Sequence, residues 1–386
     1  MAAPSKYPDW ATDQTNNLEP PAGKVAAGWV AGEEPPSGWF NWWQNLVGLW
    51  VRELAGSKAD VLAAQKLAAL NLTTRAPAGG ATDNYYAAGF GLTGGAPYTR
   101  TWLAVGQKAQ YSTNDGRTWL AAATDLSAAG VWYGVAFGAG VFALVGNTGP
   151  TASDSPLVRS STDGSTWTAR TLGGTPAAGD RLNAIVFAGG RFVAVGDKGH
   201  IQTSTDGITW TKRTAAAATD NLKAVAYCNG RYVAVGNNNA GRGVAEYSTD
   251  GTTWSRQEFV ATVAGGLALA ASSTEFVAAV VHAGANADSH LYSSPDGVTW
   301  TYQTGFTGFV VSGATCLGGL YAFCTYASTD PAFGQLSALI AGAPGSAWKK
   351  VPVESSNALY ALANNGDKLL VAGHFGFIAD SLHMVT

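Results

Sequence analysis

A five-residue motif, Asp-Gly-x-Thr-Trp, recurs along the chain and constrains its fold more than any other feature. It occurs five times, and a degenerate copy, Pro-Gly-Ser-Ala-Trp, follows the fifth. Successive motif tryptophans are 48, 43, 44, 46 and 48 residues apart. That period is the length of one four-stranded blade of a β-propeller. The six motif tryptophans are Trp119, Trp167, Trp210, Trp254, Trp300 and Trp348.

Each copy of the motif is preceded by two short apolar runs joined by a tight turn. Ahead of Trp210 the runs are residues 183–187 and 191–196, with two glycines between them. Such runs predict two antiparallel strands joined by a hairpin. Seven second runs can be counted, so the sequence predicts a mainly β fold: a seven-bladed β-propeller with an N-terminal extended and short-helical arm. The second runs begin at Trp102, Phe142, Arg191, Tyr232, Phe276, Tyr321 and Leu369.

The Asp-Gly pair of the motif has a local conformational role. The carboxylate can accept backbone N–H groups of its own turn, and glycine supplies the positive φ that closes the hairpin. The motif resembles the Asp-box (BNR-like) repeat of sialidase-type propellers, although it is one residue shorter than their Ser-x-Asp-x-Gly-x-x-Trp form. The resemblance covers residues 84–386 and implies that the repeated aspartates are structural. They are Asp115, Asp163, Asp206, Asp250 and Asp296.

The last repeat is incomplete, which predicts how the ring closes. Residues 357–386 contain three strand-like runs but no outer strand with a tryptophan. Residues 72–84 end in the same Ala-Thr-Asp-Asn sequence as residues 209–221, which include an outer strand. We therefore predict that residues 70–78 form the fourth strand of the last blade and remove an exposed sheet edge. The predicted domains are an arm (1–56), a linker helix (57–71) and the propeller (72–386).

The predicted strand order puts two kinds of loop on opposite faces of the ring. The Asp-Gly hairpins share the hairpin face with the first-to-second turns; the second-to-third and blade-to-blade loops share the loop face. The second-to-third loops are irregular, from residues 107–109 to residues 325–337. Such loops on a rigid scaffold often bind ligands, although these polar residues can also simply be solvated. The candidate receptor-binding residues, suited to sugars, are Asn238, Arg242, His282, Asp288, His290, Tyr326, Asp330 and Phe333.

The first 56 residues differ in composition from the rest because tryptophans lie among paired prolines. The prolines at 20–21 and 35–36 predict an extended, turn-rich segment. Apolar residues at 39, 43, 46, 50 and 54 have helical spacing. One short helix cannot bury so many tryptophans, which predicts a partner surface or self-association. The tryptophans expected to form this docking surface are Trp10, Trp29, Trp39, Trp42, Trp43 and Trp50.

This arm resembles the N-termini of bacteriophage tail-fibre and tail-associated proteins. The resemblance covers about 50 residues, including Tyr7-Pro8-Asp9-Trp10-Ala11, Pro20-Pro21 and Gly28-Trp29. It implies that residues 1–56 dock on other virion tail proteins and that the protein is a homo-oligomer, commonly a trimer. It also implies a protein made in the bacterial cytoplasm and located in the virion, whose propeller binds a host-surface glycan or protein. An arm that only packs against the propeller is the alternative.

Two other functions compete with receptor binding: a purely structural or decorative virion protein, and a glycan-cleaving, sialidase-like enzyme. The sialidase resemblance implies an arginine triad and a Tyr/Glu nucleophile pair, but the Arg-Ile-Pro signature of that family is absent from this sequence. The motifs Gly-x-Ser-x-Gly and His-Glu-x-x-His and a phosphate-binding Gly-Lys-Ser/Thr loop are absent too. We therefore predict a protein without catalytic residues, with glycosidase activity as the alternative.

The net charge and the composition argue against several classes of partner. The net charge is -3 without a Lys/Arg cluster, which argues against nucleic acid. Charged residues make up only 13% of the chain, and no apolar run reaches the roughly 20 residues that span a bilayer, so we expect no membrane insertion. His282, Asp288 and His290 share a loop without a fourth metal ligand, so we predict neither a metal nor another cofactor. The three cysteines are predicted to be buried free thiols.

Overall fold

The computed structural model describes residues 72–75, 83–149, 151, 154–177, 179–260, 265–282, 288–326, 338–353 and 358–381. The chain divides into two compact units, Met1–Gln65 and Lys66–Thr386, and every described residue belongs to the second. The predicted arm, its six tryptophans and the linker helix therefore lie outside the described residues. Within the described ranges, no helix is long and apolar enough to cross a membrane.

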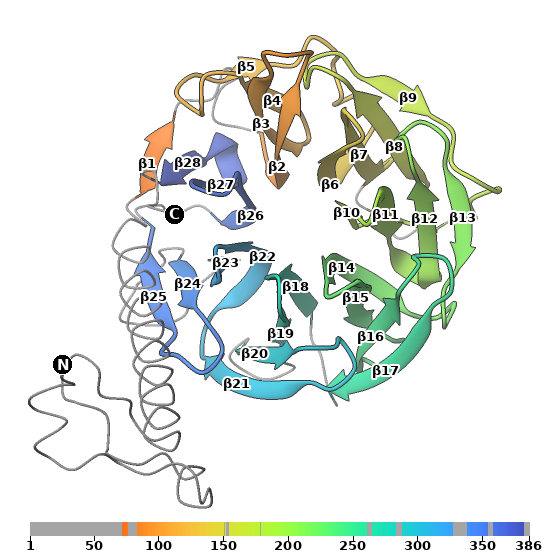
Figure 1. The fold of residues 1–386 in the computed structure, drawn as a ribbon, viewed down its shortest axis with the longest axis vertical. Coiled ribbons are helices and arrows are strands. Elements are labelled where there is room, and N and C mark those ends of the chain that lie inside the picture. The colour runs from red at the N-terminus through yellow and green to blue at the C-terminus, as the bar shows by residue number, and fades with distance from the viewer. Residues whose placement is uncertain are drawn as a thin grey trace, which may run out of the picture. The chain divides into compact units, whose positions relative to one another are not determined.

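Seven four-stranded antiparallel sheets form a ring around a central axis (Figure 1). This is the seven-bladed β-propeller that the sequence predicted. In blades 1 to 6 the strands follow one another in sequence order, and Figure 1 shows the first strand of each blade nearest the axis.

Each of the first three blades contains one copy of the repeat. Blade 1 consists of β2 (Tyr85–Thr93), β3 (Thr99–Gly106), β4 (Ala109–Ser112) and β5 (Leu120–Ala121). Blade 2 consists of β6 (Val131–Gly138), β7 (Val141–Asn147), β8 (Pro156–Ser161) and β9 (Thr168–Arg170). Blade 3 consists of β10 (Ala184–Ala188), β11 (Arg191–Val195), β12 (His200–Ser204) and β13 (Thr211–Thr214), with the short 3-10 turn η2 (Asp197–Gly199) between β11 and β12.

The next three blades repeat this arrangement. Blade 4 consists of β14 (Asn221–Cys228), β15 (Arg231–Asn237), β16 (Gly243–Ser248) and β17 (Ser255–Val260). Blade 5 consists of β18 (Gly265–Ala271), β19 (Phe276–Val281), β20 (Ser289–Ser294) and β21 (Thr301–Phe306). Blade 6 consists of β22 (Val310–Leu317), β23 (Leu320–Tyr326), β24 (Ala338–Gly342) and β25 (Lys349–Pro352).

The seventh blade is completed from the other end of the propeller sequence. Its first three strands are β26 (Leu359–Asn364), β27 (Leu369–Gly373) and β28 (Ile378–Ser381), with the 3-10 turn η3 (His374–Gly376) between β27 and β28. Its outer strand is β1 (Leu72–Arg75), which pairs antiparallel with β28 in the register Leu72↔Ser381 to Arg75↔Ile378. The sequence predicted an outer strand over 70–78, and the structure has it over Leu72–Arg75.

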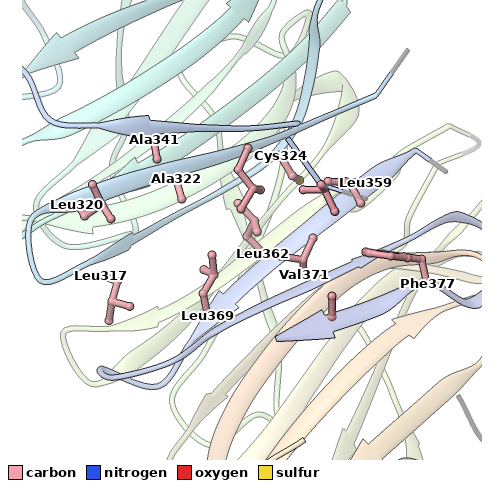
Figure 2. Packing of buried hydrophobic residues seen from close by; sticks show 13 residues of the cluster. Leu317, Leu320, Ala322, Cys324, Ala341, Leu359, Leu362, Leu369, Val371 and Phe377 are labelled. Atoms are coloured by element: carbon pink, nitrogen blue, oxygen red, sulfur yellow. The ribbon is translucent and has the colours of Figure 1, made fainter. Parts of the chain in front are cut away.

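The second strands are largely buried because neighbouring blades cover both of their faces. All residues of β7, β19 and β27 are buried, which explains why these segments read as continuous apolar runs. Between blades 6 and 7, side chains of both sheets interdigitate, among them Leu320, Leu359 and Val371 (Figure 2). Cys228 and Cys324 are buried free thiols, and Cys316 is only partly buried.

In blades 1 to 5, the repeated motif forms a compact hairpin whose tryptophan packs between that blade and the preceding one. In blade 3, the Ser204 hydroxyl donates to Asp206 Oδ1 at 2.9 Å, and the backbone N–H groups of Ile208 and Thr209 donate to the same oxygen at 2.8 Å each. The Thr209 bond is the largest of the effects that lower the pKa of Asp206 to about 2. The Trp210 indole donates to the Gly207 carbonyl at 3.3 Å and is buried between blades 2 and 3. The same Ser–Asp contact occurs at Asp163, Asp250 and Asp296.

Blade 1 departs from this pattern because its hairpin is one residue longer. There the carboxylate position is held by Asn114, whose Oδ1 accepts from the Ser112 hydroxyl at 3.0 Å and from the Thr118 N–H at 2.9 Å. Asp115, which the sequence grouped with the motif aspartates, instead accepts from the Trp102 indole at 3.1 Å at a positive φ of 63°. Asp115 thus lies in the turn but does not make the contacts of the other four aspartates.

Buried polar side chains from the third strands hold the connections between blades. The Gln202 amide donates to the Gly173 carbonyl at 2.9 Å and accepts from its N–H at 3.1 Å. The Glu246 carboxylate, which is fully buried, accepts from the N–H groups of Ala216 and Ala217 at 2.9 and 3.2 Å. Burial raises the pKa of Glu246 to about 7. These contacts replace water for backbone groups that the ring would otherwise bury unpaired.

Candidate functional site

The same β-bulge occurs at the start of the first strand in six of the seven blades. The pairing of first and second strands skips one residue there, for example between Tyr85 and Ala87 in blade 1. A bulge turns the extra side chain out of the regular alternation, and bulges often lie beside functional sites. In blade 3 the equivalent residue is Asn183, which directly precedes β10 and donates its N–H to the Val195 carbonyl at 2.8 Å. The seven positions, called the bulge ring below, are Tyr86, Tyr133, Asn183, Lys223, Gly266, Ser312 and Tyr360.

The bulge ring surrounds the mouth of the central channel. Six of its members, all except Gly266, line a cavity of about 220 Å³ on the axis, together with the next residues of every first strand. These next residues are small or aliphatic, for example Ala88, Ile185 and Leu269. The start of each first strand pairs with the end of the second strand, as in Tyr85↔Gly106. The mouth therefore opens on the loop face, with hydroxyl, amide and amine groups above an apolar shaft.

Three tyrosines from adjacent blades form one side of this mouth. The ring of Tyr86 lies 5.4 Å from that of Tyr133 and 5.2 Å from that of Tyr360, at interplanar angles of 32° and 46°. All three side chains are partly exposed. The Asn84 amide donates to the Tyr86 hydroxyl at 3.3 Å. The tyrosines thus form a curved aromatic wall across blades 7, 1 and 2. The bulge-ring residues of blades 5 and 6 are the small residues Gly266 and Ser312.

Of the two positive charges near the mouth, Lys223 has a carboxylate partner and Arg181 lies over an aromatic ring. The Lys223 amine forms a short ion pair with Asp197, which also accepts from the Asn183 amide at 2.8 Å. The Arg181 guanidinium lies 5.5 Å from the centroid of the Tyr133 ring and interacts electrostatically with Asp154. Burial raises the pKa of the Tyr133 hydroxyl, and the Arg181 charge opposes that rise.

The second-to-third turn of blade 7 adds an exposed aromatic side chain near the tyrosines. Phe375 has a φ of 50°, and half of its side chain is exposed (50%). Its N–H donates to Asn84 Oδ1 at 3.3 Å, and its ring lies 3.8 Å from that of His374. The His374 ring in turn lies 6.1 Å from Tyr360. A non-glycine residue in the left-handed region is strained and is often found at binding sites.

The receptor-binding candidates of the sequence lie farther out on the loop face. The Asn238 amide donates to Glu258 Oε1 at 3.0 Å, and Arg242 pairs with Glu258 Oε2 at 3.3 Å. Both residues therefore anchor a loop of blade 4. Neither residue lines the described channel cavity.

The candidates of blade 5 form an aromatic cluster. The rings of His282 and His290 lie 4.2 Å apart, and His282 Nε2 lies 3.3 Å from the Tyr292 hydroxyl. Burial, together with the charge of His290, lowers the pKa of His282. Asp288 Oδ1 accepts from the Gly308 N–H at 3.4 Å. Across the described ranges, no group of three His, Cys, Asp or Glu side chains is placed to hold a metal ion.

The remaining candidates fall outside the structural description. Asp330 and Phe333 lie in the segment 327–337, and of Tyr326 only the backbone, at the end of β23, is described. The sequence reading missed the bulge ring altogether. A signal was present: in every blade except blade 5, a large apolar or aromatic residue, the bulge-ring residue and a small residue follow one another near the start of the first strand, as in Tyr85-Tyr86-Ala87 and Trp132-Tyr133-Gly134.

Comparisons with known proteins identify the fold. The family described as "DUF6242 beta propeller domain" matches residues 118–226, less than a third of the chain. No curated protein matches the sequence. The solved structure described as "YCF48 bound to D1 peptide" is 14% identical with a TM-score of 0.56, and the match covers 82% of this chain and 96% of that one.

Two further structures have the same level of similarity. YCF48 from Cyanidioschyzon merolae is 12% identical with a TM-score of 0.56, over 80% of this chain and 98% of that one. A catalytically inactive variant of virginiamycin B lyase from Staphylococcus aureus, with quinupristin, is 11% identical with a TM-score of 0.58, over 81% and 99%. At such low identity these likenesses show the propeller fold alone.

Proposed function

We propose that this protein is a bacteriophage tail component that binds a host-surface glycan at the channel mouth of its propeller. The observation that carries the binding site is the bulge ring, of which six residues, from six of the seven blades, line a single cavity. Partly exposed aromatic rings beside hydroxyl and amide groups suit a sugar, because the apolar face of a sugar ring packs on an aromatic ring. Concave sites with a few convergent polar groups are the usual places for small ligands.

The chemistry of the mouth favours binding over cleavage. A glycosidase generally places two carboxyl groups on either side of the scissile bond. None of the seven bulge-ring residues carries a carboxylate, and Asp197 beside them is engaged by Lys223 and Asn183. We therefore propose that the propeller holds its ligand without changing it.

The location in the virion is proposed from the resemblance of residues 1–56 to phage tail-fibre and tail-associated proteins. In this proposal the arm docks on other tail proteins, the protein assembles as a trimer, and the propeller faces the host. Two of the solved structures that share the fold are described with another molecule, YCF48 with the D1 peptide and virginiamycin B lyase with quinupristin. Those descriptions support the propeller as a scaffold for ligands but say nothing of this ligand.

Binding to bacteria tests the proposal. The full chain, fluorescently labelled, should bind cells of a host strain and the surface polysaccharide purified from them. Tyr86→Ala should weaken this binding at least tenfold, whereas Tyr98→Ala should not, because Tyr98 is 62% exposed in the first-to-second turn of the same blade, on the hairpin face. Binding by the arm to virions, without any binding of the propeller to cells, would instead support the structural or decorative role. Release of reducing sugar from the polysaccharide would support the enzyme.

A further inference from the structure

The size of the channel cavity limits how much of a ligand can enter. The volume of the channel cavity is about 220 Å³. It is below the roughly 300–1,000 Å³ of most small-molecule sites. The cavity is therefore small for a ligand site, which favours a ligand that inserts a single ring.

The shape of the cavity limits how that ring can arrive. First strands of all seven blades line the cavity, and the ring of blades is closed by the pairing of β1 with β28. A ligand enters along the axis, through the mouth on the loop face. An internal unit of a polymer would have to send both neighbouring units out through that same mouth. The terminal unit of a chain has only one neighbour and meets no such conflict.

The charges at the mouth select against an anionic sugar. Lys223 is the one cation among the seven bulge-ring residues, and it is already paired with Asp197. Arg181 at the rim faces the Tyr133 ring and interacts with Asp154. Arg181 does not line the cavity. A carboxylate that approached Lys223 inside the cavity would have to displace Asp197 or lie beside it without a partner, and burying an unpaired charge is costly.

The amide and the serine hydroxyl of the bulge ring already have protein partners: the Asn183 amide donates to the Leu222 carbonyl at 2.9 Å, and the Ser312 hydroxyl donates to the Cys324 carbonyl at 3.2 Å. The aromatic faces of the tyrosines therefore offer the main contact surface for a ligand.

We infer that the channel mouth binds the terminal, uncharged sugar of a host glycan end-on, with one face of the sugar ring against the wall formed by Tyr86, Tyr133 and Tyr360. This inference rests on the proposed glycan-binding function and narrows its ligand. The polymer beyond the first sugar runs outward over the loop face. Affinity for the single sugar is expected in the millimolar range, and several propellers in one assembly would raise the avidity.

Competition by single sugars tests the inference on the full chain. Surface polysaccharide of the bound strain is immobilised, and binding is measured with soluble methyl glycosides of glucose, galactose, mannose and N-acetylglucosamine, and with glucuronic acid as the anionic counterpart. Each is added at about 50 mM, which would saturate a site with a millimolar Kd. We expect at least one neutral glycoside to inhibit binding and glucuronic acid to have no such effect.

Variants of the wall tyrosines test whether the single sugar inhibits polysaccharide binding by occupying the channel mouth. The affinity for the inhibiting glycoside should fall at least tenfold in Tyr86→Ala and in Tyr360→Ala, and should not change in Tyr98→Ala. Thermal melting of each variant checks that the fold is retained, and two independent tyrosine variants guard against the misfolding of one. Inhibition only by glucuronic acid would overturn the preference for a neutral sugar. Polysaccharide binding without inhibition by any single sugar would overturn end-on binding but leave the proposed function intact, whereas failure to bind any polysaccharide would overturn both.

Discussion

Arg75 and Asp380, 305 residues apart, form an ion pair that joins the outer strand of the seventh blade to its neighbour. Both Arg75 Nε and Nη2 contact Asp380 Oδ1, at 2.9 and 2.8 Å. The other carboxylate oxygen contacts Lys368 Nζ at 2.7 Å, and Lys368 also donates to the Asp115 carbonyl of blade 1 at 2.8 Å. One buried carboxylate thus links the closing strand, the last blade and the first.

Substitution at this junction should affect stability unequally. Asp380 and Lys368 are buried, whereas the side chain of Arg75 is 27% exposed. Asp380→Ala leaves the buried Lys368 amine with only the more distant Asp115 carboxylate, at 3.9 Å, so we expect a loss of about 3 kcal/mol in the free energy of unfolding. Arg75→Ala leaves Asp380 paired with Lys368 and should cost only about 1 kcal/mol. Urea unfolding of the two variants provides the comparison, and an equal loss in both would contradict this description of the junction.

Removal of the closing strand should disrupt the ring. Deletion of residues 70–78 takes β1 from the seventh blade and exposes the edge of β28 to solvent. We expect the single cooperative melting transition to be lost and the protein to aggregate more readily. Differential scanning calorimetry measures this, with deletion of residues 1–56 as the control. A melting curve unchanged by deletion of residues 70–78 would show that β1 does not close the ring.

The motif aspartates should stabilise their hairpins by accepting hydrogen bonds, and the negative charge itself should not be required. Asp206→Ala leaves the N–H groups of Ile208 and Thr209 without their acceptor and should cost about 1–2 kcal/mol. Asp206→Asn should retain most of the stability, because Asn114 makes the equivalent contacts in blade 1. Thermal melting at neutral pH compares the two. A loss as large in the asparagine variant as in the alanine variant would mean that the negative charge is required.

Glu246 should make stability depend on pH. Its folded-state pKa of about 7 lies above the unfolded value, since burial disfavours the charged form. The folded protein therefore binds more protons than the unfolded chain between these two values, and this contribution to stability is present at lower pH and is lost as the pH rises through about 7. Glu246→Gln should flatten that part of the profile between pH 5 and pH 8. Urea unfolding across this range checks it, and an unchanged slope in the variant would contradict the raised pKa.

The repeat made much of the fold predictable from the sequence. The Asp-Gly-x-Thr-Trp hairpins set the blade period, and the apolar second runs correspond to the buried strands β7, β19 and β27. These signals are local: they depend on turn chemistry and on burial between two sheets. The incomplete last repeat also pointed to the segment that supplies β1, because a four-stranded blade needs an outer strand.

The candidate site was much less predictable, for a physical reason. The side-chain direction of a bulge residue depends on the pairing register with the second strand, and a one-residue slip is not visible in the alternation of apolar residues. Tyr86 and Tyr133 therefore read as ordinary strand residues. The loop residues singled out instead, such as Asn238 and Arg242, are polar because they hold their own loop together through Glu258. Asp115 was grouped with the other motif aspartates. Blade 1, however, has one additional residue before its glycine, so Asn114 makes the hairpin contacts instead.

Hydrogen exchange by mass spectrometry tests most directly whether ligand binds at the channel mouth. The full chain is measured with and without the surface polysaccharide of a strain that it binds. We predict slower exchange at the starts of the first strands, around residues 85–88, 132–135 and 359–362, with little change in the Asp-Gly hairpins on the opposite face. Protection confined to the outer loops near residues 238–242 and 288–292, with the starts of the first strands unchanged, would contradict a binding site at the bulge ring.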